Sequence, residues 1–391
     1  MKINTPQRHD TGVVAYSHDP IEASIAAILD DRLRRRQATT AYRSPTVREI
    51  ADRLARHLDR QLDAPHRIEN VRRMFGGASK EQFRFDLAVE SEQSTTPMVL
   101  RCEPHVSIVE TPRMREFELM RMFDGIVPVP RVLSIDADGA DFGHPALIAQ
   151  FASGVQKPKQ GVSGVTGIGV HFDAAQRARL RPQFVEHLVA IHEATPLPGS
   201  LSKFDTPAVG TVDAALWAAN WWARVWREDL YEEIPLVTLT ECWLRTNLPV
   251  LDRVSVVHGD YRTGNFLFDE ETLEITAILD WELGFLGDRH ADLAWILSDL
   301  YKTTENGAQF YCGLFSSIDE LISEYEAMGG TPIDPARLHF YRVFCAWKQV
   351  ILSLGCALRA AEGHTHQDVL LGWLAAGGYP IMESLRRLLS E

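Results

Sequence analysis

The sequence has few cysteines and no long uninterrupted apolar run. Its 391 residues contain five cysteines, which are scattered and odd in number. This pattern is typical of reduced thiols rather than of a disulfide framework, and it predicts a cytoplasmic location. No secretory signal opens the sequence. The longest apolar stretch, residues 369–382, is broken by glycines and too short to span a bilayer, so we expect no membrane partner.

Basic stripes and several familiar binding motifs are also missing. The chain carries 53 acidic against 40 basic residues, a net charge of −13, and this argues against nucleic acid as the main ligand. No set of histidines and cysteines has the spacing of a zinc site. The glycines of residues 161–169 match neither the dinucleotide-binding fingerprint nor the P-loop. With 45% hydrophobic residues, the chain is nevertheless large enough for a two-lobed globular enzyme.

The most informative segment is residues 257–281, which read VHGDYRTGNFLFDEETLEITAILDW. Asp260 and Asn265 lie five positions apart, and Asp280 follows after a predicted strand, turn and strand. Transfer of a phosphoryl group requires a hydroxyl held in line and charge neutralised by Mg²⁺. An ionised Asp260 would take the hydroxyl proton, and Asn265 and Asp280 would supply the oxygen ligands that Mg²⁺ prefers. The spacing therefore predicts a phosphoryl-transfer site.

A predicted hairpin places these groups together. Residues 266–268 and 275–279 are short apolar β-formers, and the residues between them include a polar turn at 269–272. Pairing of the two strands would bring Asn265 and Asp280 side by side. The alternative is a purely structural role, with a strand-end turn at residues 258–260 and Asn265 as a turn residue. Under this alternative the spacing of Asp260, Asn265 and Asp280 would be accidental. For Asp288 and Asp292 we accept a structural role, as caps of a helix over residues 293–300.

These motifs resemble those of the aminoglycoside phosphotransferase and choline kinase-like family. The resemblance is nearest to the subgroup related to the phosphotransferase domain of acyl-CoA dehydrogenase family members 10 and 11, and it covers about residues 66–380. Arg289 stands where that subgroup usually has proline. The matching positions are His258, Gly259, Asp260, Tyr261, Arg262, Asn265, Leu279, Asp280, Trp281, Glu282, Gly287, Asp288, Asp292, Leu293 and Ala294.

The resemblance implies an α+β, protein-kinase-like fold with two lobes: a small antiparallel β lobe and a larger, mainly helical lobe. We expect an N-terminal extension with amphipathic helices over residues 1–65, the nucleotide-covering lobe over 66–153, and the helical lobe with catalytic loop and metal site over 154–391. In the smaller lobe, alternating apolar residues predict strands at 68–75 and 83–89.

Between those two strands lie Gly76, Gly77, Ser79 and Lys80, which we predict to cradle the nucleotide phosphates. Taken alone, a Gly-Gly pair between strands is more often a plain hairpin turn. Protein kinases place a phosphate-binding lysine on the third strand, where this chain has Arg101. Arginine offers a planar fork to phosphate oxygens. Its predicted helical partner is Glu116, which would otherwise be a solvated helix charge.

Arg262, His258 and a stripe of four tryptophans need separate interpretation. Arg262 lies where protein kinases hold a cation near the transferring phosphate, although it could instead bind a structural carboxylate. We interpret His258 as a loop histidine that supports the backbone, since Asp260 already suits the base. The tryptophans at 217, 221, 222 and 226 form one stripe of a predicted helix; core packing explains them most simply, and a substrate platform is the alternative.

We therefore predict an ATP- and Mg²⁺-dependent kinase, with GTP as the alternative nucleotide, that phosphorylates a hydroxyl of a small molecule. The resemblance leaves the acceptor open among aminoglycosides, macrolides, choline, homoserine and similar alcohols, with hydroxyacyl compounds suggested by the subgroup. An alternative hypothesis is a nucleotide-binding regulatory module without turnover, motivated by the missing strand lysine and the N-terminal segment. A metal-dependent phosphoesterase is the third. Oligomeric state is left open.

Overall fold

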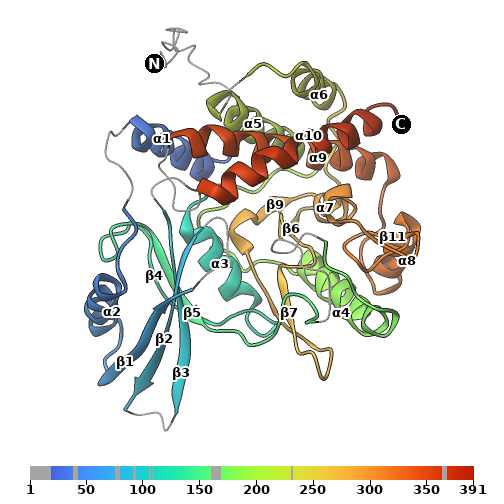
Figure 1. Cartoon of the computed structure of the whole chain (residues 1–391). Coiled ribbons are helices and arrows are strands. Elements are labelled where there is room, and N and C mark those ends of the chain that lie inside the picture. The colour runs from blue at the N-terminus through green and yellow to red at the C-terminus, as the bar shows by residue number, and fades with distance from the viewer. Residues whose placement is uncertain are drawn as a thin grey trace, which may run out of the picture.

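A strand-rich part and a helical part make up the fold (Figure 1). The computed structural model describes residues 19–37, 43–74, 80–90, 94–104, 107, 109–159, 169–229, 232–362 and 368–391. Within these ranges, only the backbone is described for residues 356–362 and 368–376.

The strand-rich part is an antiparallel five-stranded sheet in the order β1-β2-β3-β5-β4. Side chains of β2 alternate between buried and half-buried, so one face of the sheet is apolar. The strands predicted at 68–75 and 83–89 are confirmed as β1 and β2. The bounds are β1 (His66–Arg73), β2 (Glu81–Val89), β3 (Thr95–Cys102), β4 (Val132–Asp136) and β5 (Ala146–Gln150).

Two helices pack against this sheet. Helix α2 (Val47–Gln61) begins with a capping box in which Thr46 and Glu49 bond each other's backbone N–H groups. Its apolar side forms one core with β2 and β3. Helix α3 (Arg113–Phe123) contacts β4 and β5, and its buried apolar side chains belong to the core of the helical part. The sheet thus lies between α2 and α3, and α3 joins the two parts (Figure 1).

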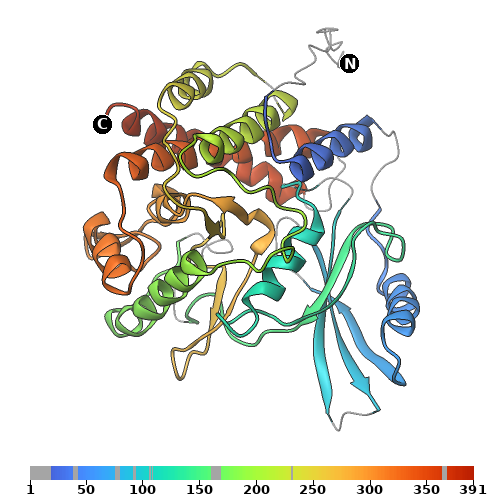
Figure 2. The same cartoon turned by 180° about the vertical axis from the view of Figure 1, so that it is seen from behind.

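The predicted N-terminal extension divides between the two parts. Helix α1 (Ala23–Gln37) packs against α5 (Asp213–Asp229) of the helical part (Figure 2), and its Ile25 and Leu29 are fully buried there. Buried Arg32 pairs with Asp229, so a charge as well as an apolar face ties α1 to α5. In contrast, α2 packs on the sheet.

The helical part is built mainly of α-helices, as the resemblance implied for the larger lobe. None of the helices in the described ranges combines the length and apolar character needed to cross a membrane. The remaining helices are α4 (Ala174–Glu193), α6 (Pro235–Thr246), α7 (His290–Ile296), α8 (Ile318–Ala327), α9 (Pro335–Glu362) and α10 (Asp368–Leu388), with 3₁₀ turns η1 (Trp281–Leu283) and η2 (Asp299–Tyr301). The short strands are β6 (Ser255–Val257), β7 (Phe266–Phe268), β8 (Ile275–Ile278), β9 (Phe285–Gly287), β10 (Thr303–Glu305) and β11 (Ala308–Phe310).

Candidate active site

The predicted hairpin is confirmed as β7 and β8. Phe266 pairs with Ile278, and the Leu279 N–H donates to the Asn265 carbonyl at 2.7 Å. The ladder therefore continues to the last residue before Asp280. Asn265 and Asp280 therefore lie at the same end of the hairpin. Asn265 ends the loop that follows β6, and Asp280 follows the last residues of β8.

The Asp260 carboxylate is the centre of a compact hydrogen-bond network. Its Oδ2 accepts a bond of 2.5 Å from Asn265 Nδ2, which also donates to the Asp260 carbonyl at 2.9 Å. Its Oδ1 accepts from Arg262 Nε at 2.9 Å and from Trp295 Nε1 at 2.6 Å. The Asp260 side chain retains 17% exposure, so the carboxylate is fixed on both oxygens yet reachable from solvent.

Asp280 is held from the sheet by Arg101. Its Oδ1 accepts a bond of 2.6 Å from Arg101 Nη2, while Arg101 Nη1 donates to Glu116 on α3 at 2.5 Å. The predicted Arg101–Glu116 ion pair is therefore confirmed. Asp280 has φ 61° and ψ 53°, a left-handed conformation that costs on the order of 1 kcal/mol for a residue other than glycine. This backbone aims the Asp280 carboxylate at Arg101, which links β3, α3 and the hairpin.

Two oxygens at this end of the hairpin have capacity for a hard cation. Within the described ranges, Asn265 Oδ1 and Asp280 Oδ2 accept no hydrogen bond, because the bonds to these residues use Asn265 Nδ2 and Asp280 Oδ1. An amide oxygen and a carboxylate oxygen suit Mg²⁺, which takes few protein ligands and completes its shell with water and phosphate. The residues present therefore fit the predicted ion.

Comparison with known proteins places this geometry in a family. The sequence model of the phosphotransferase enzyme family matches residues 70–341, which include most of the sheet and the candidate catalytic loop at residues 258–265. This chain belongs to the phosphotransferase enzyme family. The predicted resemblance to this family is confirmed, and so is the predicted subgroup. Acyl-CoA dehydrogenase family member 10 of Mus musculus is 28% identical over 201 residues, which cover 51% of this chain and 18% of that relative. The chain thus spans about a fifth of that relative's length.

Solved structures confirm the fold. A provisionally assigned aminoglycoside phosphotransferase from Ralstonia eutropha superposes with a TM-score of 0.62 at 21% identity, covering 86% of this chain and 97% of that one. An aminoglycoside phosphotransferase crystallised with GDP and kanamycin gives 0.53 at 17% identity, covering 85% and 98%. At these identities the likeness establishes the fold, which is the predicted kinase-like α+β fold with an antiparallel β lobe and a helical lobe.

In this family member, Asp292 anchors the catalytic loop. Its carboxylate on α7 accepts the His258 N–H at 2.7 Å and the Gly259 N–H at 2.8 Å, and His192 lies 3.1 Å away. The side chain has no exposed surface. Burial by itself would raise the pKa of Asp292, but the bonds from His192 and the loop lower it.

The helix-cap interpretation of Asp292 was therefore wrong. Its partners come from a different segment of the chain, and residue spacing within α7 carries no information about them. Asp288 does bond the N–H of His290 at the start of α7, at 3.1 Å, as a capping residue would.

His258 and Gly259 fit the loop for separate reasons. Buried His258 lies 3.0 Å from the Leu279 carbonyl through Nε2 and accepts the Asp260 N–H through Nδ1, so the predicted backbone-supporting role is confirmed. Burial lowers the pKa of His258, which favours the neutral ring. Gly259 has φ +80°, and a Cβ there would lie 2.3 Å from the Leu283 carbonyl oxygen. Only glycine fits this position.

Lys80 has a different setting from the predicted phosphate loop. Its amine is buried and lies 2.7 Å from Glu103 and 3.0 Å from Glu282, and it donates to Ser107 at 3.0 Å. Two carboxylates thus pair with the amine that was expected to face phosphates. This arrangement ties the turn η1, which follows Asp280, to the ends of β2 and β3. Burial would raise the pKa of Glu282, but Lys80 and neighbouring arginines lower it to about 2.

The other predicted phosphate-binding residues, Gly76, Gly77 and Ser79, lie outside the described residues. Arg262 pairs with the proposed base and stacks 4.9 Å from the Tyr301 ring centroid. Burial alone would lower the pKa of Arg262, and the Asp260 carboxylate more than offsets this effect, so the pKa is raised and the guanidinium stays charged. Contact of Arg262 with a phosphate remains a prediction.

The tryptophan stripe on α5 is largely core, as the simpler interpretation held. Trp221, Trp222 and Trp226 are buried. Trp217, Trp221 and Trp222 also line a cavity of about 30 Å³, which has room for one or two water molecules. The alternative, a substrate platform, is not supported by a space of this size.

Sequence reasoning missed Trp295 and Lys348. Trp295 bonds Asp260 directly, and Lys348 on α9 donates to the Gly259 carbonyl at 3.1 Å. For Trp295 a signal existed: it follows Asp292 by three positions on one helix, so both side chains face the same way. For Lys348 the sequence offered none.

Proposed function

We propose that this chain is a kinase that uses Mg²⁺ and ATP, or GTP in its place, to phosphorylate a hydroxyl group of a small molecule. The observation that carries the proposal is the meeting of Asp260, Asn265 and Asp280 at one end of the β7–β8 hairpin, with Arg101 reaching the same point from the sheet. One base, two oxygen ligands and one phosphate-binding cation are the groups that phosphoryl transfer requires.

Each residue has a proposed role that its position and contacts support. Asp260 accepts the proton of the acceptor hydroxyl while that oxygen attacks the γ-phosphorus, and the bond from the γ-phosphorus to the bridging oxygen of ADP breaks. Asn265 and Asp280 would hold Mg²⁺, which neutralises charge on the phosphate oxygens. Arg101, oriented by Glu116, binds the α- and β-phosphates together with Gly76, Gly77 and Ser79 of the glycine loop. Arg262 offsets charge on the transferring group.

The acceptor is a small molecule with an alcohol group. Kanamycin accompanies GDP in one structural relative, and the name of the curated relative concerns acyl-CoA dehydrogenation. The acceptor panel therefore contains aminoglycosides, simple amino alcohols such as choline and homoserine, and hydroxyacyl compounds. We also propose a cytoplasmic location, supported by free thiols at Cys102, Cys242, Cys312 and Cys345.

The experiment is ADP release measured over this panel, with and without Mg²⁺, for the wild type and for Asp260→Asn. The proposal predicts acceptor-dependent ADP release that needs the metal and falls at least about 1,000-fold in Asp260→Asn, the loss typical of a removed catalytic base. Binding of Mg-ATP with no acceptor-dependent ADP release for any alcohol would favour a regulatory module. Phosphate release from esters without ATP would favour a phosphoesterase.

A further inference from the structure

The proposed base is oriented by a residue outside the catalytic loop. Trp295, on α7, donates its indole N–H to Asp260 Oδ1 at 2.6 Å. Arg262, the other donor to that oxygen, lies only two positions from Asp260 and moves with the same loop. The indole is therefore the contact that fixes the carboxylate relative to the helical part of the molecule.

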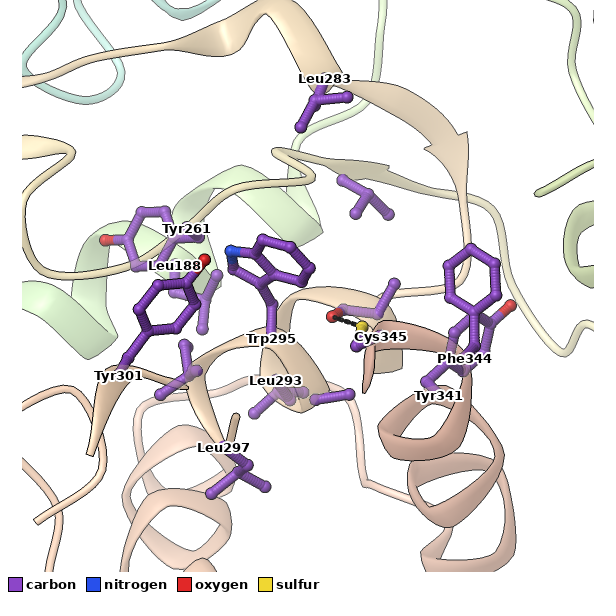
Figure 3. Close-up of a cluster of buried hydrophobic side chains, with 14 of the residues drawn as sticks. Leu188, Tyr261, Leu283, Leu293, Trp295, Leu297, Tyr301, Tyr341, Phe344 and Cys345 are labelled. Carbon is purple, nitrogen blue, oxygen red and sulfur yellow. Dashed lines mark hydrogen bonds between the residues drawn. The ribbon is translucent and has the colours of Figure 1, made fainter. Parts of the chain in front are cut away.

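Trp295 is itself rigidly held. It is 3% exposed, and its ring lies 5.7 Å from the Tyr301 ring. In Figure 3 its nitrogen points to the side of Tyr261 and Tyr301, away from Cys345. Cys345 on α9 donates through sulfur to a carbonyl of α7 at 3.6 Å, so α9 supports the helix that carries Trp295.

Lys348, also on α9, contacts both the indole and the catalytic loop. Its amine lies 4.3 Å from the centre of the Trp295 ring and donates to the Gly259 carbonyl at 3.1 Å. It is 5% exposed. A cation over the face of an indole draws electron density from the ring, and this makes the N–H a stronger donor to a carboxylate.

We propose that Trp295 is a positioning residue for Asp260 and that Lys348 strengthens this role by bracing the indole and the Gly259 carbonyl together. This inference rests on the proposed function of Asp260 as base. In-line transfer requires the Asp260 oxygen that accepts the proton to lie at hydrogen-bond distance from the acceptor hydroxyl. A carboxylate that rotates freely loses this geometry. The indole N–H occupies one lone pair of Oδ1 and sets the plane of the carboxylate.

The matched control is Trp347, a neighbouring tryptophan of α9. It is fully buried, and its indole N–H donates to the Val237 carbonyl at 3.0 Å, a contact outside the catalytic loop. Trp295→Phe and Trp347→Phe each remove one buried indole N–H bond. If Trp295 were only a core residue, the two variants would behave alike.

The kinetic test compares these variants with the wild type. Trp295→Phe is expected to lower kcat roughly 10- to 100-fold, the effect of losing one charge-assisted hydrogen bond, with KM for nucleotide and acceptor changed less than about twofold. Trp347→Phe should retain a kcat within about threefold of wild type. In an Asp260→Asn background, Trp295→Phe should lower the residual rate less than about threefold, because coupled residues are not additive.

Lys348→Met is expected to lower kcat as well, and less so when Trp295 is already phenylalanine. A kcat for Trp295→Phe equal to that of Trp347→Phe, or fully additive effects of Trp295→Phe and Asp260→Asn, would overturn the positioning role. If wild-type turnover exists and depends on Asp260, such a result removes this inference and leaves the proposed function standing.

A spectroscopic measurement keeps the inference testable without turnover. With ¹⁵N-labelled tryptophan, the nine indole N–H signals are recorded and Trp295 is assigned by its loss in Trp295→Phe. Asp260→Asn should shift the Trp295 signal upfield, because a neutral acceptor bonds the N–H less strongly, and should leave the Trp347 signal in place. A Trp295 signal that Asp260→Asn does not move would show that the contact is absent, whatever the activity of the protein.

Discussion

The catalytic loop should depend on the single carboxylate of Asp292. Its two oxygens accept the N–H groups of His258 at 2.7 Å and Gly259 at 2.8 Å, and His192 lies 3.1 Å away. Replacement by asparagine keeps the shape but leaves one acceptor oxygen and turns an NH₂ group toward a buried N–H. The loss of one charge-assisted bond, with a donor left facing a donor, should lower the free energy of unfolding by about 3 kcal/mol.

The effect on catalysis should be larger than the effect on stability. Displacement of the loop by roughly 1 Å would misplace Asp260 and lower kcat about 100-fold. Unfolding by urea, followed by circular dichroism, measures the first effect, and ADP release measures the second. Asp288→Asn, at the start of the same helix and equally buried, is the matched control and should cost stability while keeping kcat within about threefold. Equal kcat for Asp292→Asn and wild type would refute the anchoring role.

Three further predictions concern Arg101, Glu282 and Gly259. Arg101→Met removes the bonds to Glu116 and Asp280 and should raise KM for ATP about 10-fold or more in steady-state assays; an unchanged KM would contradict a phosphate-binding role. The folded pKa of Glu282 is about 2 against 4.5 for the free side chain, so its contribution of about 3 kcal/mol is complete above pH 4.5 and is lost as the pH falls toward 2. Urea titrations at pH 5 and pH 3 should reveal this loss, and a Glu282→Gln variant with an equally steep pH dependence would disprove it. Gly259→Ala should lower kcat about 100-fold, because its methyl group would meet the Leu283 carbonyl at 2.3 Å; wild-type kinetics would show that the loop tolerates the shift.

The site was predictable where its chemistry is local in sequence. Asp260 and Asn265 share one loop, and the alternation of apolar residues around a polar turn predicted the β7–β8 hairpin that brings Asp280 to them. The Arg101–Glu116 pair was predictable through the family resemblance, which places a strand cation opposite a helix carboxylate.

Long-range contacts escaped prediction for a physical reason. Asp292 and Lys348 meet the catalytic loop only after α7 and α9 pack against it, and neither spacing nor periodicity along a helix encodes which backbone groups lie opposite. The partners of Lys80 likewise come from two separate segments, the connection after β3 with Glu103 and Ser107 and the turn that holds Glu282. The division of residues 1–65 between α1 on the helical part and α2 on the sheet was equally invisible, since amphipathic helices reveal an apolar face but not the surface that it covers.

The most direct measurement is a crystal structure with Mg²⁺ and a non-hydrolysable ATP analogue. The central claim predicts an ion bound by Asn265 Oδ1 and an Asp280 carboxylate oxygen, with the γ-phosphate facing Asp260 and Arg101 at the inner phosphates. An ion coordinated elsewhere, or a nucleotide bound away from the β7–β8 hairpin, would contradict it.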